Sequence, residues 1–102
     1  MNSPENFERI INRVRYSTAN AELVASDAYW DGHNFERRGR NTFLYRTPKG
    51  NYFQVILTHW QGEQDTLTPL TEGEAIELYE TTLTEHEIDY QAAFPGVTIE
   101  DA

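Results

Sequence analysis

The side chains of this sequence with the widest chemical repertoire are three histidines, His33, His59 and His86. Their spacing matches none of the HxH, HxxxH or HExxH patterns that bring two imidazoles to one metal ion, and the chain has no cysteine. The sequence also lacks a P-loop, a dinucleotide-binding fingerprint and a nucleophile elbow. We therefore predict no metal site, no cofactor and no catalytic residue.

A small ribonuclease is the enzymatic alternative. It would need an acid and a base beside cations that stabilise the charge of a phosphorane. The side chains that could supply this set are His33, His59, Arg37, Arg40, Arg46 and Tyr52. Their spacing does not show that they converge, so a ribonuclease or a small RNA-binding protein stays an alternative to a non-enzymatic function.

Two groups of side chains could bind a partner. The first combines arginines with aromatic residues, the types that dominate binding hot spots, and consists of Arg37, Arg38, Arg40, Arg46, Tyr52 and Trp60. The second is a set of carboxylates, Glu63, Asp65, Glu72, Glu74, Glu77 and Glu80, followed by Glu85, Glu87 and Asp89. Such a surface could resemble the charge pattern of a nucleic-acid backbone and occupy a basic groove of a partner, although an ordinary solvated acidic helix would have the same composition.

Charge is distributed unevenly along the chain, which has a net charge of −9. All eight bases lie within the first 49 residues together with six acids, whereas the remaining residues carry eleven acids and no base. Overall acidity repels phosphate, so direct binding to nucleic acid or to an anionic membrane is not expected. A basic protein or a ribonucleoprotein is the expected partner.

The length of 102 residues, with 38% hydrophobic and 13% aromatic residues, fits one compact domain over residues 1–102. The last residues, 97–102, are expected to fray. No stretch approaches the ~20 apolar residues that span a bilayer, and the first residues lack a signal-peptide pattern, so a cytoplasmic location is expected.

A β-hairpin is the strongest structural signal. Residues 42–47 and 51–60 are rich in β-branched and aromatic side chains, and Pro48 and Gly50 suit a three-residue loop between them. Pairing Thr47 with Asn51 sets Tyr45 opposite Phe53. One face of this hairpin is then apolar, whereas Leu44, Arg46, Tyr52, Gln54, Ile56, Thr58 and Trp60 form a mixed face. The mixed face is either a binding surface or the bed of a helix.

Helices are predicted on both sides of the hairpin. Ser3, Pro4 and Glu5 form a typical helix start, and an i, i+3, i+4, i+7 stripe of Phe7, Ile10, Ile11 and Val14 follows, with Arg9 and Arg13 on the solvated side. Thr71 and Glu74 form a capping box for a second helix with a buried stripe of Ala75, Ile76, Tyr79 and Leu83. Residues 85–96 could add one helical turn, held by Ile88, Tyr90 and Phe94.

Strands are predicted at residues 21–26 and 66–68, the latter ending at Pro69. The expected fold is therefore α+β: an antiparallel sheet of three or four strands with an N-terminal helix and an acidic C-terminal helix.

Three segments carry a resemblance to a known group of proteins. They are YSTANAELVA at 16–25, GRNTFLYRTPKGNYF at 39–53, and PLT at 69–71 ahead of Glu74 and Ala75. Over residues 16–80 the chain resembles a family of small bacterial proteins carried by plasmids, phages and integrative elements, some of which are associated with anti-CRISPR activity. The resemblance implies an accessory factor of a mobile element, and it supplies no catalytic residues.

The function we expect is that of a non-enzymatic, anti-CRISPR-type inhibitor. It would bind a Cas protein or ribonucleoprotein of the host defence system and block nucleic-acid binding or cleavage. A further alternative is a homodimeric regulator that joins two copies through Tyr52, Ile56 and Trp60 on the mixed face.

Overall fold

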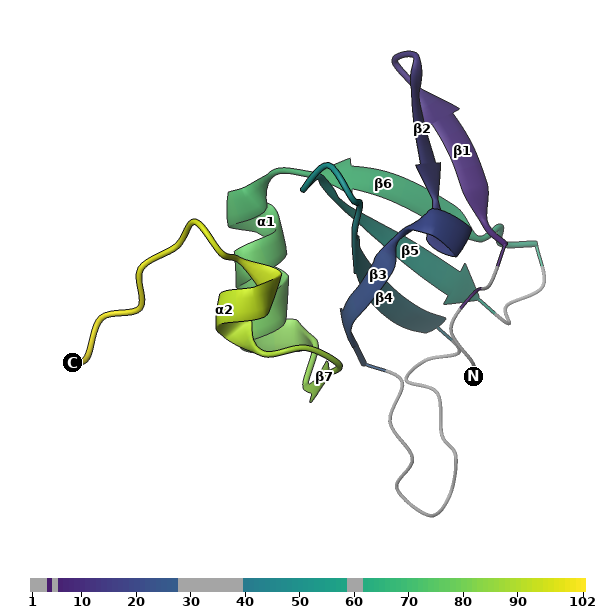
Figure 1. Ribbon diagram of the computed structural model, residues 1–102. Helices are drawn as coiled ribbons and strands as arrows, with labels where there is room; N and C mark the ends of the chain where they lie inside the picture. Colours follow the sequence, from purple (N-terminus) through teal and green to yellow (C-terminus); the bar gives the residue numbers. More distant parts are fainter. Residues whose placement is uncertain (1–3, 5, 28–39, 59–61) are drawn as a thin grey trace.

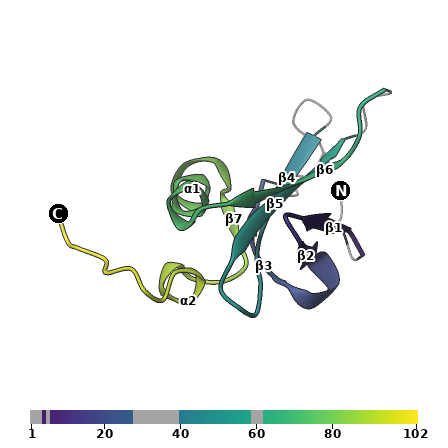
Figure 2. The ribbon, with the colours of Figure 1, turned by 90° about the horizontal axis from the view of Figure 1, so that it is seen from above.

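The computed structural model describes residues 4, 6–27, 40–58 and 62–102, and it places an antiparallel sheet between two layers (Figure 1). A separate two-stranded hairpin covers one face of the sheet, and short helices cover the other (Figure 2). The architecture is α+β, as predicted, but the expected N-terminal helix and the expected strand number are wrong.

The main sheet has five strands in the order β6-β5-β4-β3-β7. Their bounds are β3 (Glu22–Ser26), β4 (Arg40–Arg46), β5 (Tyr52–Thr58), β6 (Thr66–Leu70) and β7 (Glu85–His86). The strand that the sequence did not reveal is β7, because two residues are too few for an alternating pattern. It pairs with β3 through Ala25 opposite His86. Pro69 lies inside β6 rather than after it, which the edge position of this strand allows.

The β4–β5 hairpin confirms the predicted register, with Tyr45 opposite Phe53. The Thr47 N–H donates to the Asn51 carbonyl at 2.8 Å, and the Gly50 N–H donates to the Thr47 carbonyl at 2.9 Å. Gly50 has φ +87°, the left-handed conformation that closes such a loop at low cost only for glycine. Local turn chemistry therefore sets this pairing.

The N-terminal segment forms a second hairpin, with β1 (Glu8–Ile11) and β2 (Val14–Ser17), instead of the predicted helix. Asn12 and Arg13 form its turn with φ +52° and +68°, the positive values typical of a two-residue hairpin turn. The proposed helix start at Ser3 and Glu5 lies outside the described residues. The base of the hairpin is closed by the Thr18 hydroxyl, which accepts from the Phe7 N–H at 2.9 Å.

The spacing of Phe7, Ile10, Ile11 and Val14 resembled that of a helix because the two-residue turn interrupts the alternation of apolar and polar residues along the two strands. Phe7 and Ile11 pack against the sheet, whereas Ile10 and Val14 are 62% and 43% exposed. A helix would have buried the whole stripe. The β-branched side chains of Ile10, Ile11 and Val14 favour the extended conformation that these residues adopt.

The helical layer consists of α1 (Glu72–Glu77), a π-helical turn at Leu78–Thr82 and α2 (Tyr90–Ala93). In the π-helical turn the Leu83 N–H donates to the Leu78 carbonyl at 2.9 Å. The predicted stripe is confirmed, since Ala75, Tyr79 and Leu83 are buried and Ile76 packs against them. Asp89 caps α2 by accepting from the Ala92 N–H at 2.8 Å.

Two apolar cores lie on opposite faces of the sheet. The core under the helical layer contains Val24, Ala25, Leu44, Tyr52, Ala75, Tyr79, Leu83, Ala93 and Phe94. The core under the β1–β2 hairpin contains Phe43, Tyr45, Phe53, Val55 and Leu67. Successive residues of a strand point to opposite faces, so both faces of the β4–β5 hairpin are covered. The helices therefore cover the mixed face at Leu44 and Tyr52.

Residues 97–102 follow α2 without regular secondary structure. Within the described part of the chain, no helix is long and apolar enough to cross a membrane.

Candidate functional site

The acidic helical face is the candidate site. We use this name for seven exposed carboxylate residues of the helical layer and its neighbouring segments: Glu72, Glu74, Glu77, Glu80, Glu85, Glu87 and Asp89. No lysine or arginine follows residue 49 in the sequence. These carboxylates therefore have no basic neighbour on their own elements that could neutralise them.

Three members of the face also stabilise the fold. Glu74 completes the predicted capping box: its N–H donates to the Thr71 hydroxyl at 3.1 Å, and its carboxylate accepts from the Thr71 N–H at 2.8 Å. The hydrogen bond that the carboxylate accepts from the Thr71 N–H lowers the pKa of Glu74. Glu80 accepts from the Tyr90 hydroxyl at 2.7 Å, and this hydrogen bond raises the pKa of Tyr90. Asp89 caps α2.

The other four members, Glu72, Glu77, Glu85 and Glu87, are free carboxylates. Across residues 6–27, 40–58 and 62–102, their side chains make no ion pair or hydrogen bond. Glu77 lines a hollow of about 260 Å³ beside α1, together with Gln54, Leu70, Glu74, Leu78, Thr81 and Thr82. The face can therefore bind cations without losing internal contacts at these four positions.

The layer that carries the face is held by aromatic contacts. The ring of His86 stacks on Tyr79 with 3.7 Å between ring centroids, and its Nε2 donates to the Tyr79 carbonyl at 2.9 Å. The Tyr79 hydroxyl donates to the Ile88 carbonyl at 2.7 Å, and burial raises the pKa of Tyr79. These contacts join the π-helical turn, β7 and the segment before α2, so the free carboxylates lie on a layer held by packing.

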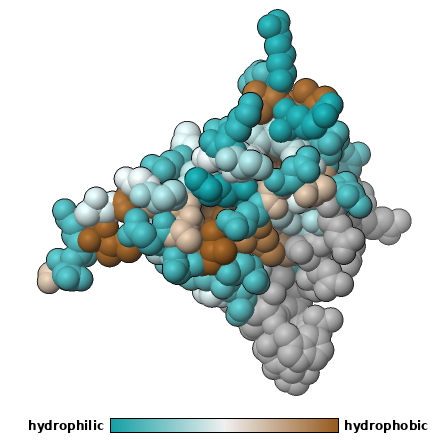
Figure 3. All heavy atoms as spheres, in the orientation of Figure 1, coloured by the Kyte–Doolittle hydropathy of each residue, from teal (hydrophilic) through white to brown (hydrophobic). Residues whose placement is uncertain are grey.

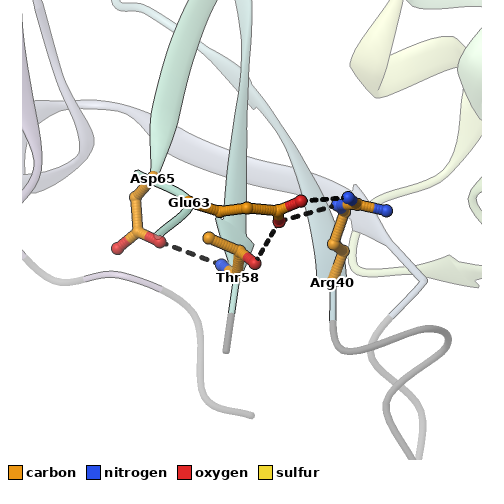
Figure 4. Close-up of polar contacts among 4 residues, drawn as sticks. All are labelled: Arg40, Thr58, Glu63 and Asp65. Atoms are coloured by element: carbon orange, nitrogen blue, oxygen red, sulfur yellow. Dashed lines mark hydrogen bonds and ion pairs between the residues drawn. The ribbon is translucent and has the colours of Figure 1, made fainter. Parts of the chain in front are cut away.

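Glu63 and Asp65 do not belong to this face. They lie at the β5–β6 corner with Arg40 and Thr58 (Figure 4). The guanidinium of Arg40 pairs with both carboxylate oxygens of Glu63, and its Nε lies 3.1 Å from Oε1. The Thr58 hydroxyl donates to the same Oε1 at 2.6 Å, and the Thr58 N–H donates to Asp65 at 2.9 Å.

This corner joins residues that the sequence had assigned to different binding surfaces. The hydrogen bonds that the Arg40 guanidinium donates to Glu63 lower the pKa of Glu63 and raise the pKa of Arg40. Each charge is satisfied by the other, so the pair ties the start of β4 to the β5–β6 corner. The charges of Arg40 and Glu63 therefore compensate each other at the surface.

The arginine and aromatic group does not form one described surface. Arg37, Arg38 and Trp60 lie outside the described residues. Tyr52 is 5% exposed, and its hydroxyl donates to the Ala93 carbonyl at 2.7 Å beneath α2. Arg40 and Arg46 occupy the two ends of β4, about 20 Å apart at roughly 3.3 Å per residue. The helical layer covers Tyr52, so this residue cannot join two copies as the dimer hypothesis required.

The ribonuclease candidates are described only in part, and of these Arg46 lies opposite Tyr52 in the β4–β5 ladder. His33 and His59 lie outside the described residues, and Tyr52 is buried away from Arg40. Among residues that the structure describes, no group of three or more His, Asp or Glu side chains could hold a metal ion.

Comparison of this chain with protein-family models, curated proteins and solved structures gave no match. The assignment of function therefore depends on the chemistry of the site itself.

The capping box gives a stability prediction. Thr71→Ala removes the side-chain acceptor for the Glu74 N–H, and we expect it to lower the free energy of unfolding by about 1 kcal/mol. Urea unfolding at neutral pH, followed by circular dichroism, measures this change. Thr71→Ser keeps the hydroxyl and should lose much less; equal losses for the two variants would contradict the role of the hydroxyl.

The same box predicts a pH dependence. The pKa of Glu74 in the folded protein lies below its ordinary value of 4.5, so its contribution is fully present above that value and is lost as the pH falls through the folded-state pKa. Glu74→Gln keeps an acceptor but cannot titrate. Its stability should consequently fall less steeply than that of the unmodified protein between about pH 5 and about pH 3, and parallel curves would contradict the prediction.

Proposed function

We propose that this protein is a non-enzymatic binding protein whose acidic helical face occupies the nucleic-acid-binding groove of a basic protein or ribonucleoprotein. The observation that supports the proposal is the set of four free carboxylates, Glu72, Glu77, Glu85 and Glu87, on a layer without lysine or arginine. Lysine and arginine side chains that normally hold phosphates would pair with these carboxylates instead.

Electrostatics favours such an encounter. Fields of one sign on a surface raise the association rate with an oppositely charged groove, and salt weakens the effect because the Debye length is only about 10 Å at 0.1 M. We therefore expect the association rate to fall with ionic strength. Inhibition would arise by competition, because the groove cannot hold the nucleic acid and the acidic helical face together.

We further propose that the partner is a Cas protein or ribonucleoprotein. The support is the resemblance of residues 16–80 to mobile-element proteins, some of them associated with anti-CRISPR activity. The most specific part, LYRTPKGNYF, forms the end of β4, the loop and the start of β5. Leu44 and Tyr52 of this run pack under the helical layer, so the run supports the layer whose carboxylates are proposed to contact the partner.

The test is a competition assay with purified Cas effector complexes and a fluorescently labelled nucleic-acid target. The decisive variant is Glu72→Lys/Glu77→Lys, because neither carboxylate forms a hydrogen bond or an ion pair with a described residue. Glu100→Lys/Asp101→Lys in the C-terminal tail changes the net charge by the same amount and is the matched control. We expect the first variant to weaken competition by at least about tenfold, or ~1.4 kcal/mol, and the control to weaken it far less.

Two outcomes would refute the proposal in this form. One is an equal loss in both double variants, which would mean that only net charge matters. The other is loss of competition in Arg37→Glu/Arg38→Glu while Glu72→Lys/Glu77→Lys competes normally, which would move the contact to the arginine-rich segment.

A further inference from the structure

A second charged region lies on the opposite side of the sheet, between the β1–β2 hairpin and the β4–β5 loop. It is a groove of about 400 Å³ lined by Arg13, Val14, Arg15, Tyr16, Thr47, Pro48, Lys49 and Asn51. We call it the basic groove. Sequence reasoning had assigned Arg13 to the solvated side of a helix, so this site was not predicted.

The basic groove is positively charged, whereas the molecule as a whole is negatively charged. Its lining includes three cations, Arg13, Arg15 and Lys49, and no carboxylate, in a protein with a net charge of −9. Arg13 and Lys49 form no ion pair with any residue that the structure describes. Arg15 lies 3.7 Å from Glu8, but both side chains are exposed, and such pairs contribute little.

The backbone at Arg13 carries a conformational cost. Its φ of +68° is left-handed, and glycine is the residue favoured at the second position of this kind of turn. Asn12, at φ +52°, is of a type that tolerates this region. Strained residues are concentrated at functional sites, and the arginine here supplies a cation at the edge of the groove that glycine could not supply.

The lining also indicates a class of ligand. Arginine and lysine bind phosphate through charge-assisted hydrogen bonds, and the Thr47 hydroxyl, which accepts from the Asn51 N–H at 3.1 Å, can still donate one. Tyr16, Pro48 and the 43% exposed Val14 add an apolar part. Figure 3 shows apolar atoms on the hairpin beneath a polar tip, at the top of the view.

We infer that the basic groove binds a nucleoside phosphate, with the phosphate on Arg13, Arg15 and Lys49 and the base on the apolar side. The volume lies in the range of small-molecule sites. The nucleoside phosphate is either a free nucleotide or the terminal nucleotide of a single strand, since both present the same chemistry. This site is independent of the proposed function, because it involves neither the acidic helical face nor a protein partner.

Calorimetric titration of the full chain at low ionic strength tests the inference, with inorganic phosphate, AMP and a 5′-phosphorylated tetranucleotide as probes. We expect AMP to bind at least about tenfold more tightly than phosphate, because only AMP reaches the apolar side. A tetranucleotide that binds more tightly than AMP would identify a strand end, and equal affinities would identify a free nucleotide. Absence of AMP binding, or equal affinities for AMP and phosphate, would overturn the inference.

Variants separate the groove from general electrostatics. Lys49→Gln should weaken AMP binding by about tenfold, whereas Arg9→Gln, an equal change of charge on β1 outside the groove, should weaken it less than about twofold. Equal effects of the two substitutions on AMP affinity would contradict binding in the basic groove.

Arg13→Gly supplies a readout that a merely structural role would not give. We expect it to raise the Tm by roughly 2–5 °C while weakening AMP binding, because glycine relieves the left-handed strain and removes a phosphate contact. A higher Tm with unchanged AMP affinity would remove Arg13 from the site.

Discussion

Replacing Phe94 with alanine is expected to lower the free energy of unfolding by about 3–5 kcal/mol. Phe94 is fully buried, and its ring centroid lies 5.3 Å from that of Tyr52, 5.5 Å from Tyr79 and 5.3 Å from Tyr90. The side chain thus joins β5, the π-helical turn and α2. Truncation leaves a cavity at the point where the helical layer meets the sheet, and the loss is a large part of the roughly 5–15 kcal/mol that stabilises a domain.

Urea unfolding measured by far-ultraviolet circular dichroism gives the loss as a shift of the midpoint. Ile99→Ala is the control, because Ile99 is 57% exposed in the tail and should change stability by less than about 0.5 kcal/mol. A Phe94→Ala midpoint close to that of the control would show that the helical layer is held by other contacts. The proposed competition with nucleic acid should weaken as well, although no carboxylate is altered.

Replacing Phe53 with alanine is expected to cost a similar ~3–5 kcal/mol, but on the other face of the sheet. Phe53 is fully buried; its ring stacks on Tyr45 with centroids 5.2 Å apart and meets Tyr16 edge-on at 5.7 Å. Tyr16 belongs to β2, so this ring joins the β1–β2 hairpin to the sheet. The basic groove, which Tyr16 also lines, should lose affinity for AMP along with the hairpin's order.

Amide hydrogen exchange distinguishes the two substitutions. Phe53→Ala should reduce protection mainly in the β1–β2 hairpin, and Phe94→Ala mainly in α1 and α2, because the two side chains lie in separate cores. Phe53→Leu keeps most of the apolar volume and should lose less than half as much stability as Phe53→Ala. Exchange that accelerates equally in both layers for both variants would contradict the separation of the cores.

The features predicted correctly are those that a few neighbouring residues determine. Gly50 can take a positive φ that closes the β4–β5 loop, and the loop length then sets Tyr45 opposite Phe53. Thr71 and Glu74 satisfy each other's backbone groups three residues apart. Both signals act within one turn, so no distant segment can override them easily.

The N-terminal prediction failed because two local signals competed. The spacing of Phe7, Ile10, Ile11 and Val14 fits a helix, but Asn12 and the β-branched residues around it fit a hairpin turn. The choice depended on what the segment packs against: the sheet accepts Phe7 and Ile11 on its free face. That face is assembled from strands remote in the sequence.

The candidate site was predicted only in part. The acidic character of residues 72–89 is visible in the sequence, but the pairing of Glu63 with Arg40 spans 23 residues and leaves no local trace. Tyrosine is a residue type common in binding hot spots, so the sequence favoured an exposed Tyr52, but α2 covers this side chain. The basic groove combines Arg13 and Arg15 with Lys49, more than thirty positions away in the chain.

The sequence by itself determined the separation of charge, since every base precedes residue 50, and it determined the turns and caps that close within a few residues. The tertiary structure decided which carboxylates are free, which are bound by Arg40 or by helix caps, and which elements cover each face of the sheet. The physical reason is range: backbone dihedral preferences act between neighbours, whereas ion pairs and burial depend on distances that exist only after the strands have paired.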